Sequence, residues 1–459
     1  PLAVLSEVSG VSRAEFGDVL RVLRQAELAF DTLRGGDAIL NFRHPLIQDV
    51  AYRGLLSERR RTLHSAVAKA IQSHFSNRLD EYAGLLAFHL EQAGALREAA
   101  QFLIRSSIWV GANDPKQALA AWKKVAEILR KQPAAMDTDY MRMMACGQVV
   151  NFGWREGMGA DEARGWFEEA AGLATAHKNM RANALIHAAY GRILAATGSA
   201  DEYAQKVREA QAIAGEASDG SLEVTLSAVL CQALRLSGRL PEALAVNEAA
   251  LDRIHELGKF ERDMLGFDVE IWLLALRGRM IVELGRGEEA VETLDRVIGM
   301  DPGKIDPAHR FIPHLAHVEK AWSEKDAALA AAHAAKALEI AEASGTPYVR
   351  VYAQWAQGLA LSTAGEHAQA ASLLRETLDY AREKKAGLEN EARLLSDLSS
   401  ARLAIDMAPR AYELAQEAVA VAQKRNARAE ECRARISKAA AARALGRMDE
   451  YDADRAEAA

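Results

Sequence analysis

One stretch decides the fold: Ile271–Pro302, which reads IWLLALRGRMIVELGRGEEAVETLDRVIGMDP. Apolar residues recur at helical spacing in two runs on either side of Gly285. Gly278 lies within the first run and Ala290 near the start of the second, so two helices can approach closely at these small residues. Gly285 provides a permissive turn, and Asp301-Pro302 ends the second helix because proline cannot continue it. The stretch predicts an antiparallel pair of helices.

The same frame recurs along the chain and resembles the tetratricopeptide repeat. Successive turn glycines lie 40 residues apart (Gly198 to Gly238), then 47 (to Gly285), then 80 (to Gly365). Plain tetratricopeptide repeats have a period of about 34 residues, so each helix here is about one turn longer. The clearest copies are Ala184–Ile213, Val224–Leu251, Val351–Ala381 and Glu431–Ala459, with weaker ones at Tyr82–Val110, Tyr140–Ala176, Trp322–Ala330 and Asp406–Ala418. We therefore expect an all-α, right-handed superhelical solenoid of TPR-like helix-turn-helix repeats.

Composition limits the partners and the compartment. The 459 residues are 50% hydrophobic and carry a formal net charge of −7, so the overall field does not favour nucleic acid. We find no run of 18 apolar residues to span a membrane. The three cysteines are far apart and form no C-x-x-C pair, which indicates buried thiols in a reducing cytoplasm. Since the chain begins at Pro1 without an initiator Met, we expect it to be cut from a longer polypeptide.

Residues 1–56 follow a different pattern. Helical patterns at Leu2–Val8 and Arg13–Arg24 precede two short alternating segments on either side of Gly35-Gly36-Asp37, a hairpin turn signal. Helix, helix and hairpin is the layout of a winged-helix domain. We expect a winged-helix-like piece at 1–56, first helical pairs at 57–135 and the repeat solenoid at 136–459.

A family resemblance is carried by FRHPLIQDVAY (Phe42–Tyr52), RRRTLH (Arg59–His64) and LLAFHLEQAG (Leu85–Gly94). These segments resemble large bacterial signalling proteins in which a class III adenylate cyclase domain precedes a STAND-type ATPase and a tetratricopeptide tail. The resemblance is specific over Phe42–Leu129 and implies that ATPase or cyclase domains lie upstream in cis. No G-x-x-x-x-G-K-[ST] loop occurs, so we expect no catalysis from this segment itself.

Two features of the N-terminal region are candidate contacts. The resemblance implies that His44 touches the phosphate of a nucleotide bound to the ATPase; the alternative is that His44 caps or packs a helix. Arg59-Arg60-Arg61, with Arg53 and His64, is either an anion contact or a solvated helix face, and we favour the solvated face because residues 1–80 are nearly balanced in charge.

The concave face of the solenoid is the predicted binding surface, because aromatic and Arg side chains of the first helices should face it. The alternative for each Trp is ordinary packing between helices. His314 and His317, with His333, could suggest a metal, but lone surface histidines are commoner, so we predict no metal and no cofactor. The predicted groove residues are Arg192, Gln232, Arg235, Trp272, Arg279, Glu283, Glu319, Trp322, Tyr352 and Trp355.

These observations favour a regulatory sensor region that binds a peptide, a partner protein or a small ligand in the groove and biases the attached enzyme. Two alternatives remain: a stand-alone scaffold for protein complexes, and the sensor of a transcription activator resembling the maltose regulator. From the groove assignment we expect Arg279→Ala or Trp355→Ala to weaken binding without lowering the melting temperature.

Overall fold

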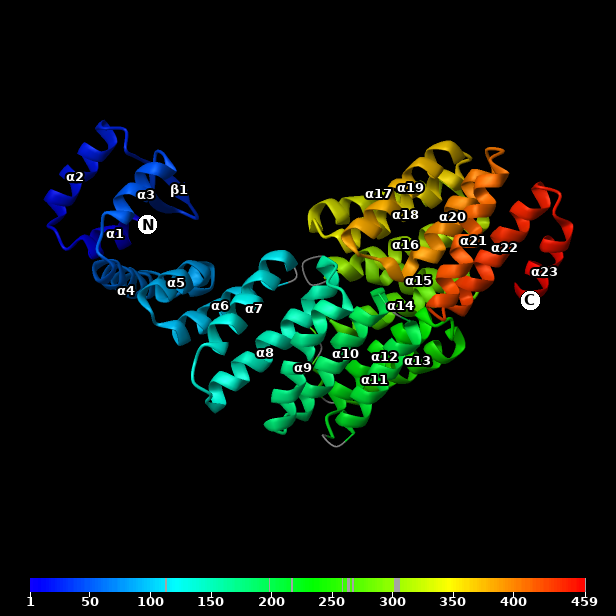
Figure 1. The fold of residues 1–459 in the computed structure, drawn as a ribbon, viewed down its shortest axis with the longest axis horizontal. Helices are drawn as coiled ribbons and strands as arrows, with labels where there is room; N and C mark the ends of the chain where they lie inside the picture. Colours follow the sequence, from blue (N-terminus) through cyan, green and yellow to red (C-terminus); the bar gives the residue numbers. More distant parts are fainter. Residues whose placement is uncertain are drawn as a thin grey trace. The chain divides into compact units, whose positions relative to one another are not determined.

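The computed structural model describes residues 1–111, 114–197, 199–215, 218–257, 259–261, 265, 268–300 and 306–458 (Figure 1). They belong to two compact units, which we call unit 1 (residues 1–110 and 120–145) and unit 2 (residues 111–119 and 146–459). The described residues are helical apart from one β-hairpin and the connecting turns, so the all-α solenoid predicted from the sequence is confirmed.

Unit 1 begins with the predicted helix, helix and hairpin. The hairpin is antiparallel, and its register runs from Ala29 opposite Phe42 to Arg34 opposite Asp37. Gly35 and Gly36 form the two-residue turn of the hairpin with φ of 58° and 86°. A hairpin turn of this type needs positive φ at both positions, which glycine adopts readily. The elements are α1 (Leu2–Ser9), α2 (Arg13–Gln25), β1 (Ala29–Arg34), β2 (Asp37–Phe42) and α3 (Pro45–Arg53).

The core of unit 1 lies where α1 packs on α4 (Ser57–His74), α4 packs on α5 (Leu79–Ala93) and α5 packs on α6 (Leu96–Val110). Ile71, Phe75 and Leu86 are central to it, and Val4 joins from α1. Two further helices, α7 (Pro115–Arg130) and α8 (Met136–Gly153), contribute residues to both units.

Unit 2 is a succession of helix pairs in which each helix packs on the next in sequence (Figure 1). Its elements after α8 are η2 (Trp154–Glu156), α9 (Ala160–Ala176), α10 (Met180–Thr197), α11 (Ala200–Ala214), α12 (Gly220–Leu236), α13 (Leu240–Glu256), α14 (Val269–Glu283), α15 (Gly287–Ile298), α16 (Pro307–Glu324), α17 (Ala327–Ser344), α18 (Pro347–Thr363), α19 (His367–Lys384), η4 (Leu388–Asn390), α20 (Glu391–Leu403), α21 (Ala408–Lys424), α22 (Arg428–Ala444) and α23 (Met448–Ala458).

The small residues of the repeat sit where the two helices of a pair touch. A Cβ added to Gly278 would lie 2.5 Å from the Leu294 side chain, and one added to Gly358 would lie 2.5 Å from Leu374. Both distances are far shorter than carbon–carbon contact, so only glycine fits at these two positions without movement. The close approach predicted at Gly278 is confirmed, and it repeats in the pair α18–α19.

The turns within pairs are left-handed at one residue. Gly238, Gly285 and Gly365 have φ of 76°, 76° and 82°, where glycine is favoured because it lacks a Cβ. In two of the weaker copies, Trp322–Ala330 and Asp406–Ala418, Lys325 and Asp406 take this conformation instead, with φ of 61° and 58°. The predicted turn at Gly198 and the predicted helix stop at Asp301-Pro302 lie outside the described residues.

The first helices of the pairs form an inner layer, and the second helices form an outer layer. Each of α10, α12, α14, α16, α18 and α20 also contacts the first helix of the next pair. The inner helices are therefore buried almost all round: thirteen residues of α12 are buried, against three of the outer helix α15.

Early and late parts of unit 2 also meet across the inner face. The α10 helix contacts η4, and η2 contacts α18. The backbone of Gly157 lies against the carbonyl oxygen of Lys384 so closely that a Cβ at Gly157 would be 1.9 Å from it. Part of the inner wall is consequently covered by other segments of unit 2.

Two further expectations from composition bear on the described residues. Cys146 and Cys231 are buried, as predicted, whereas Cys432 is partly exposed. None of the helices in the described ranges is both long and apolar enough to cross a bilayer.

Candidate functional site

The ten predicted groove residues come from the inner helices, but most of them are buried. Trp322 is 40% exposed, whereas Trp272 and Trp355 are 6% and 1% exposed. The structure divides the other members into a chain of buried ion pairs and the lining of a recessed pocket. Arg235, Arg279, Glu283 and Glu319 belong to the ion pairs; Arg192, Gln232 and Trp272 line the pocket; Tyr352 and Trp355 pack beside these groups.

The ion pairs join equivalent positions of successive inner helices. The Arg235 guanidinium on α12 donates to Glu283 on α14 (3.0 Å), and Arg279 on α14 donates twice to Glu319 on α16 (3.0 and 2.9 Å). Arg393 on α20 approaches Glu319 to 3.5 Å. The partners lie 48 and 40 residues apart, close to the repeat period, so the repeat itself places charge against charge.

Burial and pairing act in opposite directions on these charges. Burial by itself would raise the pKa of Glu319, but the nearby Arg279 and Arg393 outweigh it and hold the pKa at about 2. Trp355 donates its indole N–H to Asp397 (2.8 Å) and packs against both guanidinium groups, 5.7 and 5.3 Å from its ring centre. Arg279 and Trp355 are thus parts of a buried polar core, and we now expect their truncation to reduce stability.

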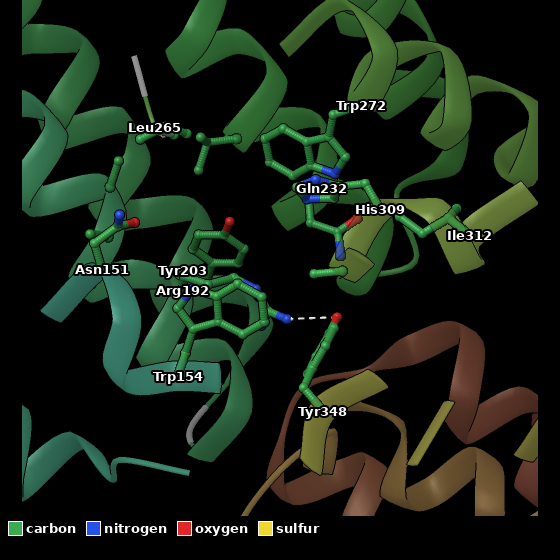
Figure 2. A pocket seen from close by; sticks show the side chains of 14 residues that line it. Asn151, Trp154, Arg192, Tyr203, Gln232, Leu265, Trp272, His309, Ile312 and Tyr348 are labelled. Atoms are coloured by element: carbon green, nitrogen blue, oxygen red, sulfur yellow. Dashed lines mark hydrogen bonds between the residues drawn. The ribbon is translucent and has the colours of Figure 1, made fainter. Parts of the chain in front are cut away.

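The inner-wall pocket is a recess between early and late parts of unit 2 (Figure 2). Figure 2 shows Asn151, Tyr203, Arg192 and Trp154 on one side of it and Trp272, His309 and Ile312 on the other. The recess leaves about 60 Å³ for the centres of water molecules. Its lining comprises Asn151, Trp154, Ala188, Ala189, Arg192, Tyr203, Val229, Gln232, Leu265, Trp272, Ala308, His309, Ile312 and Tyr348.

Arg192 ties the two sides of the pocket together. One terminal nitrogen, Nη2, donates to the Tyr348 hydroxyl (3.0 Å) and to Glu389 (2.8 Å), and the guanidinium lies 4.6 Å from the Trp154 ring centre. Although burial alone would raise the pKa of Glu389, the Arg192 charge outweighs it and the pKa is below its usual value. The pair is therefore ionised at neutral pH and internally balanced.

A second buried ion pair supports the same wall. Arg155 in η2 donates to both carboxylate oxygens of Asp306 (3.0 and 2.7 Å), the N-cap residue of α16. The Arg155 guanidinium also covers the Trp154 ring at 4.6 Å from its centre. Next to this pair, burial lowers the pKa of His309 to about 4, so its imidazole is neutral at pH 7 and packs on Trp272 with ring centres 5.4 Å apart.

Two pocket residues carry buried polar atoms without a partner. Gln232 Oε1 and Arg192 Nη1 have no hydrogen-bond partner among the described residues. Such atoms cost about 1–3 kcal/mol each when they stay unpaired. An acceptor and a donor in an aromatic recess are the kind of polar groups that orient a bound ligand.

The sequence prediction did not include Trp154, Tyr203, His309 or Tyr348 among the groove residues. It considered the concave positions of first helices, whereas Trp154 lies in the short turn before α9 and Tyr203 on a second helix. One local signal was present: Trp154-Arg155 stands just before the turn glycine Gly157, where a large aromatic side chain needs a partner to be buried.

In unit 1, His44 is the N-cap of α3. Its Nδ1 accepts from the backbone N–H of Leu46 (3.2 Å), which matches the capping alternative; the nucleotide contact stays a prediction. In the basic cluster, Arg59 and Arg61 are exposed and Arg60 lies over the Tyr52 ring at 5.0 Å. This arrangement matches the solvated face that we favoured.

The three histidines considered for a metal do lie together. His314 Nδ1 is 3.0 Å from His333 Nδ1, His317 stacks on His333 with ring centres 4.2 Å apart, and His317 contacts Asp295 at 3.0 Å. Burial lowers the pKa of His314 and of His333 to about 4. Within the described ranges, no group of three or more His, Cys, Asp and Glu is arranged to hold a metal ion.

No protein-family model matches the chain, and no curated protein matches it. Among solved structures, it is similar to a Rap protein complexed with competence and sporulation factor (12% identity, 83% of this chain and 84% of that chain, TM-score 0.40). It is also similar to a STAND protein with a tetratricopeptide repeat sensor from Pyrococcus horikoshii (12%, 99% and 70%, 0.38) and to the APC/C heterotetramer Cut9–Hcn1 (10%, 90% and 89%, 0.38). Because these identities and TM-scores are low, we take the fold from the helix packing of this chain and not from the similar structures.

Proposed function

We propose that unit 2 is the ligand-sensing region of a regulatory protein and that its ligand binds in the inner-wall pocket. The observation that carries this is the pair of unpartnered polar atoms on Gln232 and Arg192 in an aromatic recess of the inner wall. Because early and late repeats both line the pocket, a ligand there contacts parts of the chain more than 150 residues apart. Binding would favour the arrangement in which those parts are in contact, and so bias any domain attached to them.

The form of the site favours a small ligand, or one inserted side chain of a partner, over a peptide laid along an open groove. Most of the inner surface that a long peptide would need is occupied by the buried ion pairs of Arg235, Arg279 and Glu319. Regulation of an upstream ATPase or adenylate cyclase in cis, including a nucleotide contact by His44, is the proposed output and rests on the family resemblance alone.

The test is to fill the pocket. Ala189 lines it, and Ala189→Met should occupy part of the free space while keeping the site apolar. Compounds that raise the melting temperature of the unaltered chain should then lose that effect, since stabilisation follows ligand occupancy. Ala332→Met, at an exposed position of α17, is the matched control. Ligands that stabilise both variants equally would show that the pocket is not the binding site.

A second candidate function, a protein-interaction scaffold, is favoured by apolar side chains exposed on unit 1. Leu46 and Val50, which are one turn apart on α3, are 65% and 74% exposed, and neighbouring exposed apolar side chains typically mark protein contacts. One comparison separates the two functions. A sensor changes its affinity for a protein partner when the pocket is occupied, whereas a scaffold binds its partner equally in both states.

A further inference from the structure

The size of the inner-wall pocket sets the size of what it can bind. It leaves about 60 Å³ for water centres. This is room for a few water molecules only. An apolar cavity of about 150 Å³ accommodates benzene, and the recess is smaller than that. A single ring with one small substituent is therefore the upper limit of what the pocket can take.

The charges around the pocket are already balanced. Arg192 is neutralised by Glu389, which is 2% exposed, and Arg155 by Asp306, which is also 2% exposed. His309 is neutral at pH 7 because burial lowers its pKa to about 4. A charged ligand would bring a charge without a counter-ion into this recess, and an unpaired buried charge is strongly unfavourable. An uncharged ligand is favoured.

The walls add an aromatic preference. Trp154 and Tyr348 meet edge to face with ring centres 4.7 Å apart, and Trp272 and Tyr203 contribute two further rings. Aromatic side chains interact favourably with another ring in stacked or edge-to-face geometry, beyond the effect of the buried area. A planar ring therefore suits this lining.

The unpaired atoms specify the substituent. Gln232, which is 7% exposed, has the acceptor Oε1 without a partner, and Arg192 has the donor Nη1 without one, among the residues that the structure describes. A primary carboxamide carries both complements, since its N–H can donate to Gln232 and its C=O can accept from Arg192. A carboxylate has no donor, and an ammonium has no acceptor.

We infer that the inner-wall pocket binds an uncharged, single-ring aromatic carboxamide. This inference rests on the proposed function of the pocket and adds the chemical class of its ligand. Benzamide is the simplest probe of that class. Benzoate, benzylammonium and toluene keep the ring and change only the substituent.

The experiment measures dissociation constants of the four probes for the full chain by ligand-detected NMR. We expect benzamide to bind at least tenfold more tightly than benzoate and benzylammonium, and at least threefold more tightly than toluene. Gln232→Met removes the unpaired acceptor and keeps a side chain of similar size. It should weaken the binding of benzamide three- to tenfold and leave the binding of toluene unchanged. If that variant does not fold, the ranking of probes on the unaltered chain still decides.

Two kinds of result would overturn the inference. If toluene or a charged probe binds as tightly as benzamide, and Ala189→Met abolishes that binding, the ligand class is wrong although the pocket still binds ligands. The same holds if Gln232→Met folds and binds benzamide as tightly as the parent. If no probe shows binding that Ala189→Met abolishes, both the ligand class and the proposed function of the pocket fail.

Discussion

Removing one charge from the inner core should destabilise unit 2 far more than removing a surface charge from the same repeat. In Arg279→Met a 3% exposed guanidinium is replaced by an apolar side chain of similar length, and two hydrogen bonds to Glu319 are lost. Breaking a buried ion pair by removing one partner costs about 3–5 kcal/mol. Glu319 keeps Arg393 at 3.5 Å, so we expect the lower end, about 3 kcal/mol.

The assay is urea unfolding followed by circular dichroism at 222 nm. With a urea m-value of about 3 kcal/mol/M, the midpoint should fall by roughly 1 M. The control is Arg286→Met on the adjoining turn, where Arg286 pairs with Glu289 and both side chains are about half exposed. Exposed pairs contribute about 0–1 kcal/mol, so this variant should unfold close to the parent.

A double variant separates loss of the pair from loss of packing. In Arg279→Met with Glu319→Leu both members of the pair are apolar, and replacing a whole buried pair by apolar residues is often neutral. Arg393, which loses Glu319 in this variant, keeps Asp397 at 3.8 Å and Glu430 at 4.0 Å. We expect the double variant to be more stable than Arg279→Met alone. An Arg279→Met protein within about 1 kcal/mol of the parent, or a double variant less stable than the single one, would refute a buried, mutually dependent ion pair.

Three further predictions concern packing and protonation. Gly278→Ala should lower the free energy of unfolding by about 1–3 kcal/mol, because its Cβ would meet a leucine side chain. Gly172→Ala, at an open position of α9, should raise it by about 0.5–1 kcal/mol. Thermal unfolding of the two variants measures both effects. Gly157→Ala and Gly285→Ala share the same backbone strain (φ 77° and 76°), but the first should be clearly less stable because it also meets a carbonyl across the inner face; equal melting temperatures would contradict that contact. Burial holds the pKa of His309 at about 4, below its unfolded value of about 6.5, so stability is full above pH 6.5 and falls as pH drops toward 4. At pH 5 the free energy of unfolding should have fallen by about 2 kcal/mol because of this group. In His309→Gln, the decrease between pH 7 and pH 5 should be smaller by that amount.

The helix pairs and the N-terminal hairpin could be predicted from sequence because their determinants are local. Gly278 and Leu294, which touch, are sixteen residues apart, and the turn at Gly285 lies between them. Within such a distance, apolar spacing and turn residues are enough to define the pair. The hairpin at Gly35-Gly36 was predictable for the same reason.

Whether the concave face is open was decided only by the tertiary structure. The sequence placed Arg192, Gln232 and Arg279 on the inner face, but it did not show that residues 150 or more positions away return to cover that face. The contacts of Arg192 with Tyr348 and of Arg155 with Asp306 depend on how small rotations accumulate over several repeats. No local sequence pattern specifies the sum of these rotations. Local spacing therefore predicted which residues face inward, whereas their burial, their ion pairs and the pocket depend on how the whole array coils.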